Sequence, residues 1–343
     1  MCFIHNKKRT ISLCAVLAIP AVATSALLLL SKQESGVRIV DDKAFEEAKG
    51  VRCLAYAKLE DQLLVGYKDG TLAKYRMYDM SCIAIERSHN NSQVFSISTC
   101  NETRNVGCYV SCGSDNRIVL HREGQETVFD NRYEASVQIS ADDAYCIAAG
   151  ISASEIAAVW TLQDLKKVQT IPLDVPSDSN GCLAVSPTKN IFAVSGFRNR
   201  ALILWDIATA SVIRERACEH VTQVAFNQKG DKLFILDNNF TFYVCDLALN
   251  VLRRLEIGGS AAFCVTADDR WLFAGYAIGA AAGLPGRIQV WDLAAGKLVR
   301  ERTVSDHQIT SMILVNGRTI VTGSLSGKHG LKRWSVDELI KGP

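Results

Sequence analysis

The chain has 343 residues, of which 48% are hydrophobic and 22% are charged, and its formal net charge is +2. This composition supplies enough apolar side chains for a large core and excludes a wholly disordered chain. The only basic tract is Lys7–Arg9, so the concentrated positive charge typical of nucleic-acid binding proteins is missing, and nucleic acid is not expected as a partner.

A membrane segment is predicted near the N-terminus. Ile11–Leu30 is an uncharged apolar run of twenty residues, which at about 1.5 Å per helical residue is long enough to cross a bilayer. A basic flank at 1–10 precedes it and a linker at 31–36 follows. We favour an uncleaved transmembrane or signal-anchor helix over a cleaved signal peptide, because cleavage near Ala21–Ala23 would leave a leucine-rich end exposed. An organellar targeting segment is the third alternative.

Two features give opposite predictions for the side of the membrane on which the body lies. The basic flank, by the positive-inside rule, puts the N-terminus in the cytoplasm and the body on the exoplasmic, periplasmic or organellar side. The twelve cysteines lie mostly in apolar runs, as buried free thiols do, and favour a reducing compartment. Cys100 and Cys108 could face each other across a hairpin. Because charge beside a first helix acts more directly on topology, we favour the exoplasmic, periplasmic or organellar side.

A repeat with a period of about 43 residues begins at residue 51. Each unit has a short apolar strand, a polar turn, a second strand ending near Gly or Ser, and a third strand ending on an aromatic residue or its substitute. The seven marks on the third strands are Tyr75, His121, Trp160, Trp205, Cys245, Trp291 and Trp334. They predict an all-β fold over residues 37–343, a seven-bladed β-propeller of four-stranded blades, preceded by one hydrophobic helix.

These repeats resemble those of the WD-repeat family. The pairs Trp205-Asp206 and Trp291-Asp292 match the Trp-Asp signature of the family, and Cys245-Asp246 is a half-match. The resemblance covers roughly residues 37–339 and implies a propeller that serves as a platform for other proteins.

The resemblance also implies a hydrogen-bonded tetrad in each blade, formed by a histidine before the first strand, Ser or Thr in the second, Asp in the next turn and Trp in the third. The last blade offers His307 and Trp334 but no Asp in the turn at 326–330, and in blade five Cys245 replaces the Trp. We therefore expect no blade to form a complete tetrad.

Ring closure is expected to involve the N-terminal side of the body. Only nine residues follow Trp334, too few for the usual outer strand, whereas the β-prone run Val37–Val40 precedes blade one. The family resemblance implies that such a strand completes the last blade, which would bring the membrane segment to the seam of the ring.

Catalytic and cofactor motifs are missing from the sequence. It contains no nucleophile elbow, no P-loop and no dinucleotide-binding glycine pattern before a helix, and no histidine pair has helical zinc spacing. The pairs Asp142-Asp143 and Asp268-Asp269 occupy equivalent hairpin turns, where a structural role is expected. We predict no enzymatic activity, no cofactor and no metal site.

One insertion stands out as a candidate contact site. In blade six, residues 277–287 replace a tight turn with small apolar residues, glycine and proline, and loops on a rigid scaffold commonly carry binding. The candidate partner-binding residues are Ala277, Ile278, Leu284, Pro285 and Arg287.

The leading hypothesis is a non-catalytic, membrane-tethered scaffold that docks other proteins on its faces and loops, either alone or as a subunit of a membrane or organellar complex. The alternative is an exported propeller enzyme or small-ligand binder that uses the central channel. The predicted inner strands are mainly Val, Ala, Cys and Phe. This composition favours the scaffold, because a ligand site needs convergent polar groups.

Overall fold

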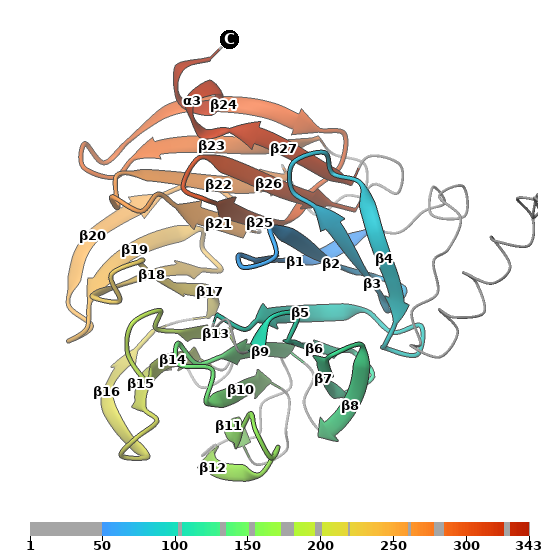
Figure 1. Cartoon of the computed structure of the whole chain (residues 1–343). Helices are drawn as coiled ribbons and strands as arrows, with labels where there is room; N and C mark the ends of the chain where they lie inside the picture. Colours follow the sequence, from blue (N-terminus) through green and yellow to red (C-terminus); the bar gives the residue numbers. More distant parts are fainter. Residues whose placement is uncertain are drawn as a thin grey trace, which may run out of the picture.

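Seven antiparallel sheets form blades around a common axis (Figure 1). Six sheets have four strands, and the seventh has three within the described residues. The predicted all-β propeller with seven blades of the four-stranded type is confirmed. The computed structural model describes residues 50–101, 105–130, 135–150, 155–172, 182–195, 201–218, 220–259, 262–277, 285–325 and 330–342.

Within each blade the strands follow the chain from the axis outwards. Blade one contains β1 (Val51–Ala57), β2 (Gln62–Tyr67), β3 (Thr71–Arg76) and β4 (Cys82–Arg87); blade two contains β5 (Val94–Thr99), β6 (Tyr109–Gly113), β7 (Ile118–Arg122) and β8 (Gln125–Asp130); blade three contains β9 (Ala135–Ile139), β10 (Tyr145–Gly150), β11 (Glu155–Thr161) and β12 (Lys167–Pro172). Blade four contains β13 (Cys182–Val185), β14 (Ile191–Ser195), β15 (Ala201–Asp206) and β16 (Ser211–Ala217); blade five contains β17 (Val221–Phe226), β18 (Lys232–Asp237), β19 (Thr241–Asp246) and β20 (Val251–Glu256). Blade six contains β21 (Ala262–Val265), β22 (Trp271–Ala277), β23 (Gly286–Asp292) and β24 (Lys297–Ser305); blade seven contains β25 (Ile309–Val315), β26 (Thr319–Ser324) and β27 (Leu331–Ser335), and the helix α3 (Val336–Lys341) follows it.

Burial within a blade follows from its two neighbours. A middle strand is covered on both faces, so it is a continuous apolar run; β14, for example, is buried at every position. An outer strand such as β16 is largely exposed. The core is therefore divided into apolar clusters that lie between adjacent blades.

The paired aspartates have the structural role expected from the sequence. Asp142 accepts a hydrogen bond from the Ser140 hydroxyl at 2.6 Å, and Asp268 accepts the equivalent bond from Thr266 at 2.5 Å. The second aspartate of each pair has a positive φ, 54° at Asp143 and 58° at Asp269. Both pairs therefore form the tight turn between the first two strands of a blade.

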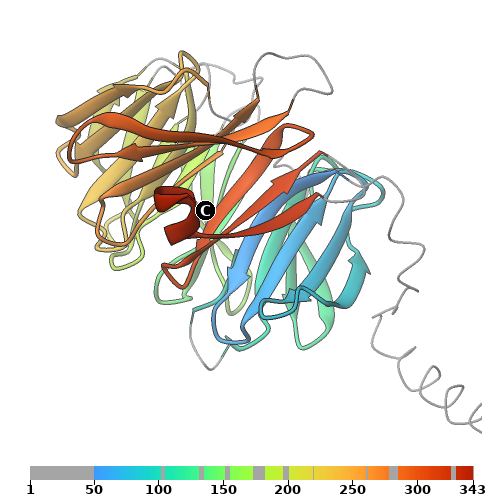
Figure 2. The ribbon, with the colours of Figure 1, turned by 90° about the horizontal axis from the view of Figure 1, so that it is seen from above.

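Blade seven closes the ring against blade one, and Figure 2 shows the red strands of the last blade beside the blue strands of the first. The Thr310 hydroxyl donates to the carbonyl of Val51 at 2.6 Å. At Gly323, a Cβ would lie 2.3 Å from Cγ1 of Val51, so glycine permits the close approach of the two blades. Similarly, a Cβ at Gly66 of blade one would lie 2.8 Å from Cγ1 of Val94 in blade two. This contact explains why the second strand of the repeat ends near glycine.

The expected closing strand, Val37–Val40, lies outside the described residues, as do the segment Ile11–Leu30, its basic flank at 1–10 and the linker at 31–36. The one helix among the described residues, α3, has six residues and packs against β24 and β27. In the described part of the chain, no helix has the length and apolar character needed to span a bilayer.

The closing contact can be tested by replacing Thr310 with valine. Thr310→Val keeps the shape of the side chain and removes the donor to the buried Val51, so we expect the free energy of unfolding to fall by about 1–2 kcal/mol in urea denaturation. The control is Thr303→Val, at an exposed position on β24. We expect it to change the free energy of unfolding by less than about 0.5 kcal/mol. Equal small changes in both variants would contradict the role assigned to Thr310.

Candidate functional site

The predicted contact loop of blade six joins β22 to β23. Ala277 is the last residue of β22, Pro285 precedes β23 and Arg287 belongs to it, whereas Ile278 and Leu284 lie outside the described residues. Arg287 pairs with Glu301 of β24 at 2.5 Å between Nη1 and Oε1. The stem of the loop is thus fixed to the outer strand, and partner binding by the loop stays a prediction.

The seven repeat marks all lie on the third strand of their sheets, and the aspartates that follow three of them cap the next turn. Tyr75, His121, Trp160, Trp205, Cys245, Trp291 and Trp334 lie on β3, β7, β11, β15, β19, β23 and β27. Asp206, Asp246 and Asp292 accept the backbone N–H groups of Thr209, Asn250 and Ala295 at 3.0, 2.8 and 2.8 Å. The Trp-Asp signature is therefore structural at these positions.

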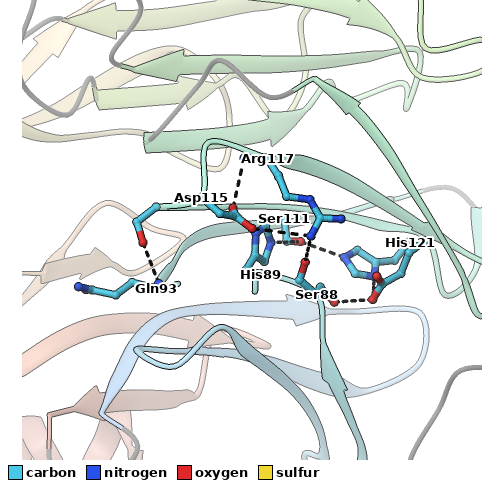
Figure 3. Close-up of polar contacts among 9 residues, drawn as sticks. Ser88, His89, Gln93, Ser111, Asp115, Arg117 and His121 are labelled. Carbon is cyan, nitrogen blue, oxygen red and sulfur yellow. Dashed lines mark hydrogen bonds and ion pairs between the residues drawn. The ribbon is translucent and has the colours of Figure 1, made fainter. Parts of the chain in front are cut away.

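A buried polar relay crosses blade two (Figure 3). Nδ1 of His89 lies 2.9 Å from Oδ1 of Asp115, and its Nε2 lies 2.9 Å from the hydroxyl of Ser111. The same hydroxyl lies 2.9 Å from Nε2 of His121 on β7. Ser111 and His89 are fully buried or nearly so, and His121 is 4% exposed. All three side chains therefore depend on one another for hydrogen bonds.

The direction of donation along the relay follows from Asp115. Burial opposes ionisation of this carboxyl, but its hydrogen bond with His89 and the nearby Arg117 lower the pKa of Asp115 below its usual value. The carboxylate accepts the Nδ1–H of His89, so a neutral His89 accepts at Nε2 from the Ser111 hydroxyl. Ser111 then accepts from Nε2–H of His121. Nδ1 of His121 is left facing the other way, towards the outer rim.

Blade two forms a hydrogen-bonded relay of four side chains although it lacks the Trp of the expected tetrad. His89, Ser111 and Asp115 supply the expected His, Ser and Asp, and His121 stands in the position expected for Trp. From the sequence, His121 is identified only as a repeat mark, and Ser111 and Asp115 are not predicted as functional residues. The run Gly113-Ser114-Asp115, after the second strand of the repeat, was the available signal.

Blades five and seven, which offered partial tetrads, form smaller networks. In blade seven the indole Nε1 of Trp334 donates to the Thr322 hydroxyl at 3.2 Å. In blade five Asp237 accepts the backbone N–H of Thr241 at 2.8 Å and the hydroxyl of Tyr243 at 3.2 Å. Asp237 therefore fixes a turn. Cys245 on β19 lies opposite Leu233 and is buried as an apolar residue.

The outward side of His121 meets two carboxylates. Its Nδ1 lies 3.5 Å from Oε2 of Glu86, on β4 of blade one, and 3.8 Å from Oε1 of Glu126 on β8. Tyr109 stacks on the imidazole with ring centroids 4.2 Å apart and donates its hydroxyl to Oε2 of Glu86 at 2.5 Å. Ser88 donates to Oε1 of Glu126 at 2.5 Å. Within the described residues, this is the group of His, Cys, Asp and Glu side chains with the spacing of metal ligands.

Glu86 is ionised over the whole physiological range. Burial opposes its ionisation, but the hydrogen bond from His121 and the Lys74 ammonium, whose Nζ lies 3.0 Å from Oε1, lower the pKa of Glu86 to about 2. The cluster therefore carries fixed negative charge next to a ring nitrogen.

A cleft of about 650 Å³ lies between blades two and three. Arg122 lines it from blade two, and Asp143, Tyr145 and Thr161 line it from blade three. Asp143 accepts the backbone N–H of Asn101 at 2.9 and 3.0 Å. The hydrogen bonds of Asp143 thus join blade three to blade two.

The cysteines of the described residues are free thiols, Cys100 and Cys108 included. Burial raises the pKa of Cys182 to about 12 and that of Cys245 to about 11. Cys53 and Cys146 are buried as well, and Cys264 is half-buried. The interpretation of these cysteines as buried apolar residues is confirmed, with a partial exposure at Cys264.

Comparison with known proteins supports the fold. No protein-family model matches the chain, and no curated protein does. Among solved structures, the β-propeller domain of Cps50 (Swd1) from Myceliophteria thermophila is similar, with a TM-score of 0.70 and 13% sequence identity over 84% of this chain and 97% of that one. At this identity the similarity establishes the fold alone, and it agrees with the resemblance to WD-repeat propellers.

The relay predicts that the stability of the protein depends on the hydroxyl of Ser111. Ser111→Ala leaves two buried imidazole nitrogens without a partner, and we expect the free energy of unfolding to fall by about 2–4 kcal/mol. The control Ser211→Ala removes an exposed hydroxyl on β16 and should change it by less than about 0.5 kcal/mol. Urea denaturation of both variants measures the difference. A Ser111 variant as stable as the control would show that the relay does not hold the blade.

Proposed function

We propose that the chain is a non-catalytic scaffold that docks other proteins on the outer rim of the propeller and is tethered to a membrane by Ile11–Leu30. The observation that carries the docking proposal is a set of exposed apolar side chains, accompanied by exposed and half-buried basic side chains, on the outer strands of blades four, five and six. We call this surface the basic rim, and it comprises β16, β20 and β24.

Large apolar side chains are exposed along the basic rim. Five of them are between 40% and 55% exposed: Val212, Val251, Leu252, Leu298 and Val299. Isolated surface hydrophobics are ordinary, but a group on the outer strands of three consecutive blades supports a contact surface.

The charge of the basic rim is one-sided. Its three strands carry seven basic side chains against three acidic ones, although the whole chain has a net charge of only +2. The basic residues are Arg214, Arg216, Arg253, Arg254, Lys297, Arg300 and Arg302, and the acidic residues are Glu215, Glu256 and Glu301. By contrast, β8 of blade two carries two acidic and no basic side chains.

Backbone geometry adds a second means of contact. Each strand of the basic rim is the last of its sheet among the described strands, so one of its edges has no neighbouring strand. An extended segment can add to such an edge through main-chain hydrogen bonds. The partner that fits is a protein segment with apolar side chains flanked by acidic ones.

The position of the basic rim is compatible with tethering. The described chain begins at Gly50, which packs against Leu325 at the seam of blades seven and one, whereas β16 and β20 lie across the ring from blade one (Figure 1). A protein attached through residues before Gly50 would leave that part of the rim free for a partner.

The alternative function, an enzyme or small-ligand binder that uses the central channel, requires convergent polar groups on the inner strands. The inner strands β13 (CLAV) and β21 (AFCV) are apolar, whereas β5 (VFSIST) and β17 (VTQVAF) carry Ser, Thr and Gln but no His, Cys, Asp or Glu. The scaffold is therefore the function we propose.

The docking proposal predicts a loss of partner contact in Leu252→Asp. The change puts a negative charge in the basic rim at an exposed position, so folding should be preserved and partner recovery by cross-linking in native membranes should fall about tenfold or more. The matched control is Val168→Asp, on the outer strand of blade three and exposed to a similar extent. If both variants recover partners as the wild type does, the arginines of the rim serve only to prevent edge-to-edge aggregation.

The tether predicts that the chain stays with the membrane pellet after alkaline carbonate extraction, and that deletion of 11–30 releases it. Protease protection of the body in intact membranes then reports the side, with protection expected for the exoplasmic, periplasmic or organellar side. Release of the full chain by carbonate would contradict the tether and leave the docking proposal standing.

A further inference from the structure

The geometry points to a binding site for a divalent transition-metal ion at the outer side of the interface between blades one and two. We infer that Glu86, His121 and Glu126 are its ligands. The inference is independent of the proposed function, and it departs from the sequence-based expectation of no metal site.

The three ligand atoms lie slightly farther apart than the ligands of an occupied metal site. In a tetrahedral zinc site with bonds of about 2.0–2.1 Å, neighbouring ligand atoms lie about 3.4 Å apart. Nδ1 of His121 lies 3.5 Å from Oε2 of Glu86 and 3.8 Å from Oε1 of Glu126, and all three atoms lie within 4.8 Å of one another. Small side-chain movements would bring them round one ion.

The relay of blade two orients the imidazole for this role. Because Asp115 only accepts, donation along the relay commits Nε2–H of His121 to Ser111. Nδ1 of His121 then faces two carboxylate oxygens. A positive charge between the three atoms satisfies this arrangement, and either a proton on Nδ1 or a metal ion in its place supplies it. Histidine ligands of metals are typically held in this way, with the second ring nitrogen donating to a fixed acceptor.

The carboxylates are also oriented by neighbouring donors. Tyr109 donates to Oε2 of Glu86, and Ser88 donates to Oε1 of Glu126, which are the oxygens that face His121. Lys74 pairs with the other oxygen of Glu86, at 3.0 Å, and so neutralises one of the two negative charges. The carboxylate of Glu126 is left without such a cationic partner among the contacts described here, and a divalent ion would lie between it, Glu86 and His121.

An ion can reach the site from solvent. The side chain of Glu126 is 38% exposed, whereas those of Glu86 and His121 are 11% and 5% exposed. The site thus has one open side, where water can complete the coordination. One nitrogen and two carboxylate ligands favour Zn²⁺ or Co²⁺ over Mg²⁺ and Ca²⁺, which prefer oxygen alone.

The test is titration of the purified full chain, with its cysteines kept reduced, with Co²⁺ followed by visible absorption. We expect saturable binding of one Co²⁺ per chain, displaced by Zn²⁺, with ligand-field bands but no thiolate charge-transfer band. The absence of that band separates this site from binding by the many cysteines. Glu126→Gln should weaken binding about tenfold or more. The matched control Glu215→Gln, on the exposed outer strand of blade four, should bind as the wild type does.

A second variant tests whether a loss of metal binding is caused by misfolding. His121→Gln keeps an amide N–H near the position of Nε2, so the bond to Ser111 can persist while the Nδ1 ligand is lost, and we expect the same weakening with an intact thermal unfolding transition. The inference is overturned if the wild type shows no saturable Co²⁺ binding, if its spectrum shows thiolate ligation, or if folded Glu126→Gln and His121→Gln bind as Glu215→Gln does.

Discussion

Contact between the last and first blades is the constraint on which the rest of the structure depends. Each blade hides its two faces only because a neighbour lies on either side, so an open ring would expose two apolar faces. Gly323 sets the spacing at the seam, and the Thr310 hydroxyl joins the seam to Val51. Once the ring is closed, the outer strands and the loops are the surfaces left for other molecules.

Blade two shows how one side chain changes what a structural network can do. An indole at the position of His121 would donate one hydrogen bond to Ser111 and end the relay there. The imidazole has a second nitrogen, so the relay continues to the acidic pair Glu86 and Glu126 at the rim. The network that joins the strands of this blade thus also fixes the orientation of His121.

The rim is not uniform around the ring. Blades four to six present exposed Val, Leu and Arg side chains, whereas blade two presents carboxylates around a buried histidine. These surfaces differ in charge and lie on different blades. A scaffold of this kind can hold a protein segment on one side of the ring and an ion on the other without either competing for space.

The sequence by itself determined the number of blades, the third strand of each, the turns at Asp142-Asp143 and Asp268-Asp269, and the buried character of most cysteines. Each of these depends on local pattern: apolar runs, turn residues and a repeated mark. Tertiary structure alone decided the relay and the acidic cluster. His89 and Asp115 are 26 residues apart, and Glu86 belongs to a different blade from His121, so no local spacing connects them. The packing of one blade against the next brings these residues together. Because that packing buries their polar groups away from water, they form hydrogen bonds with one another.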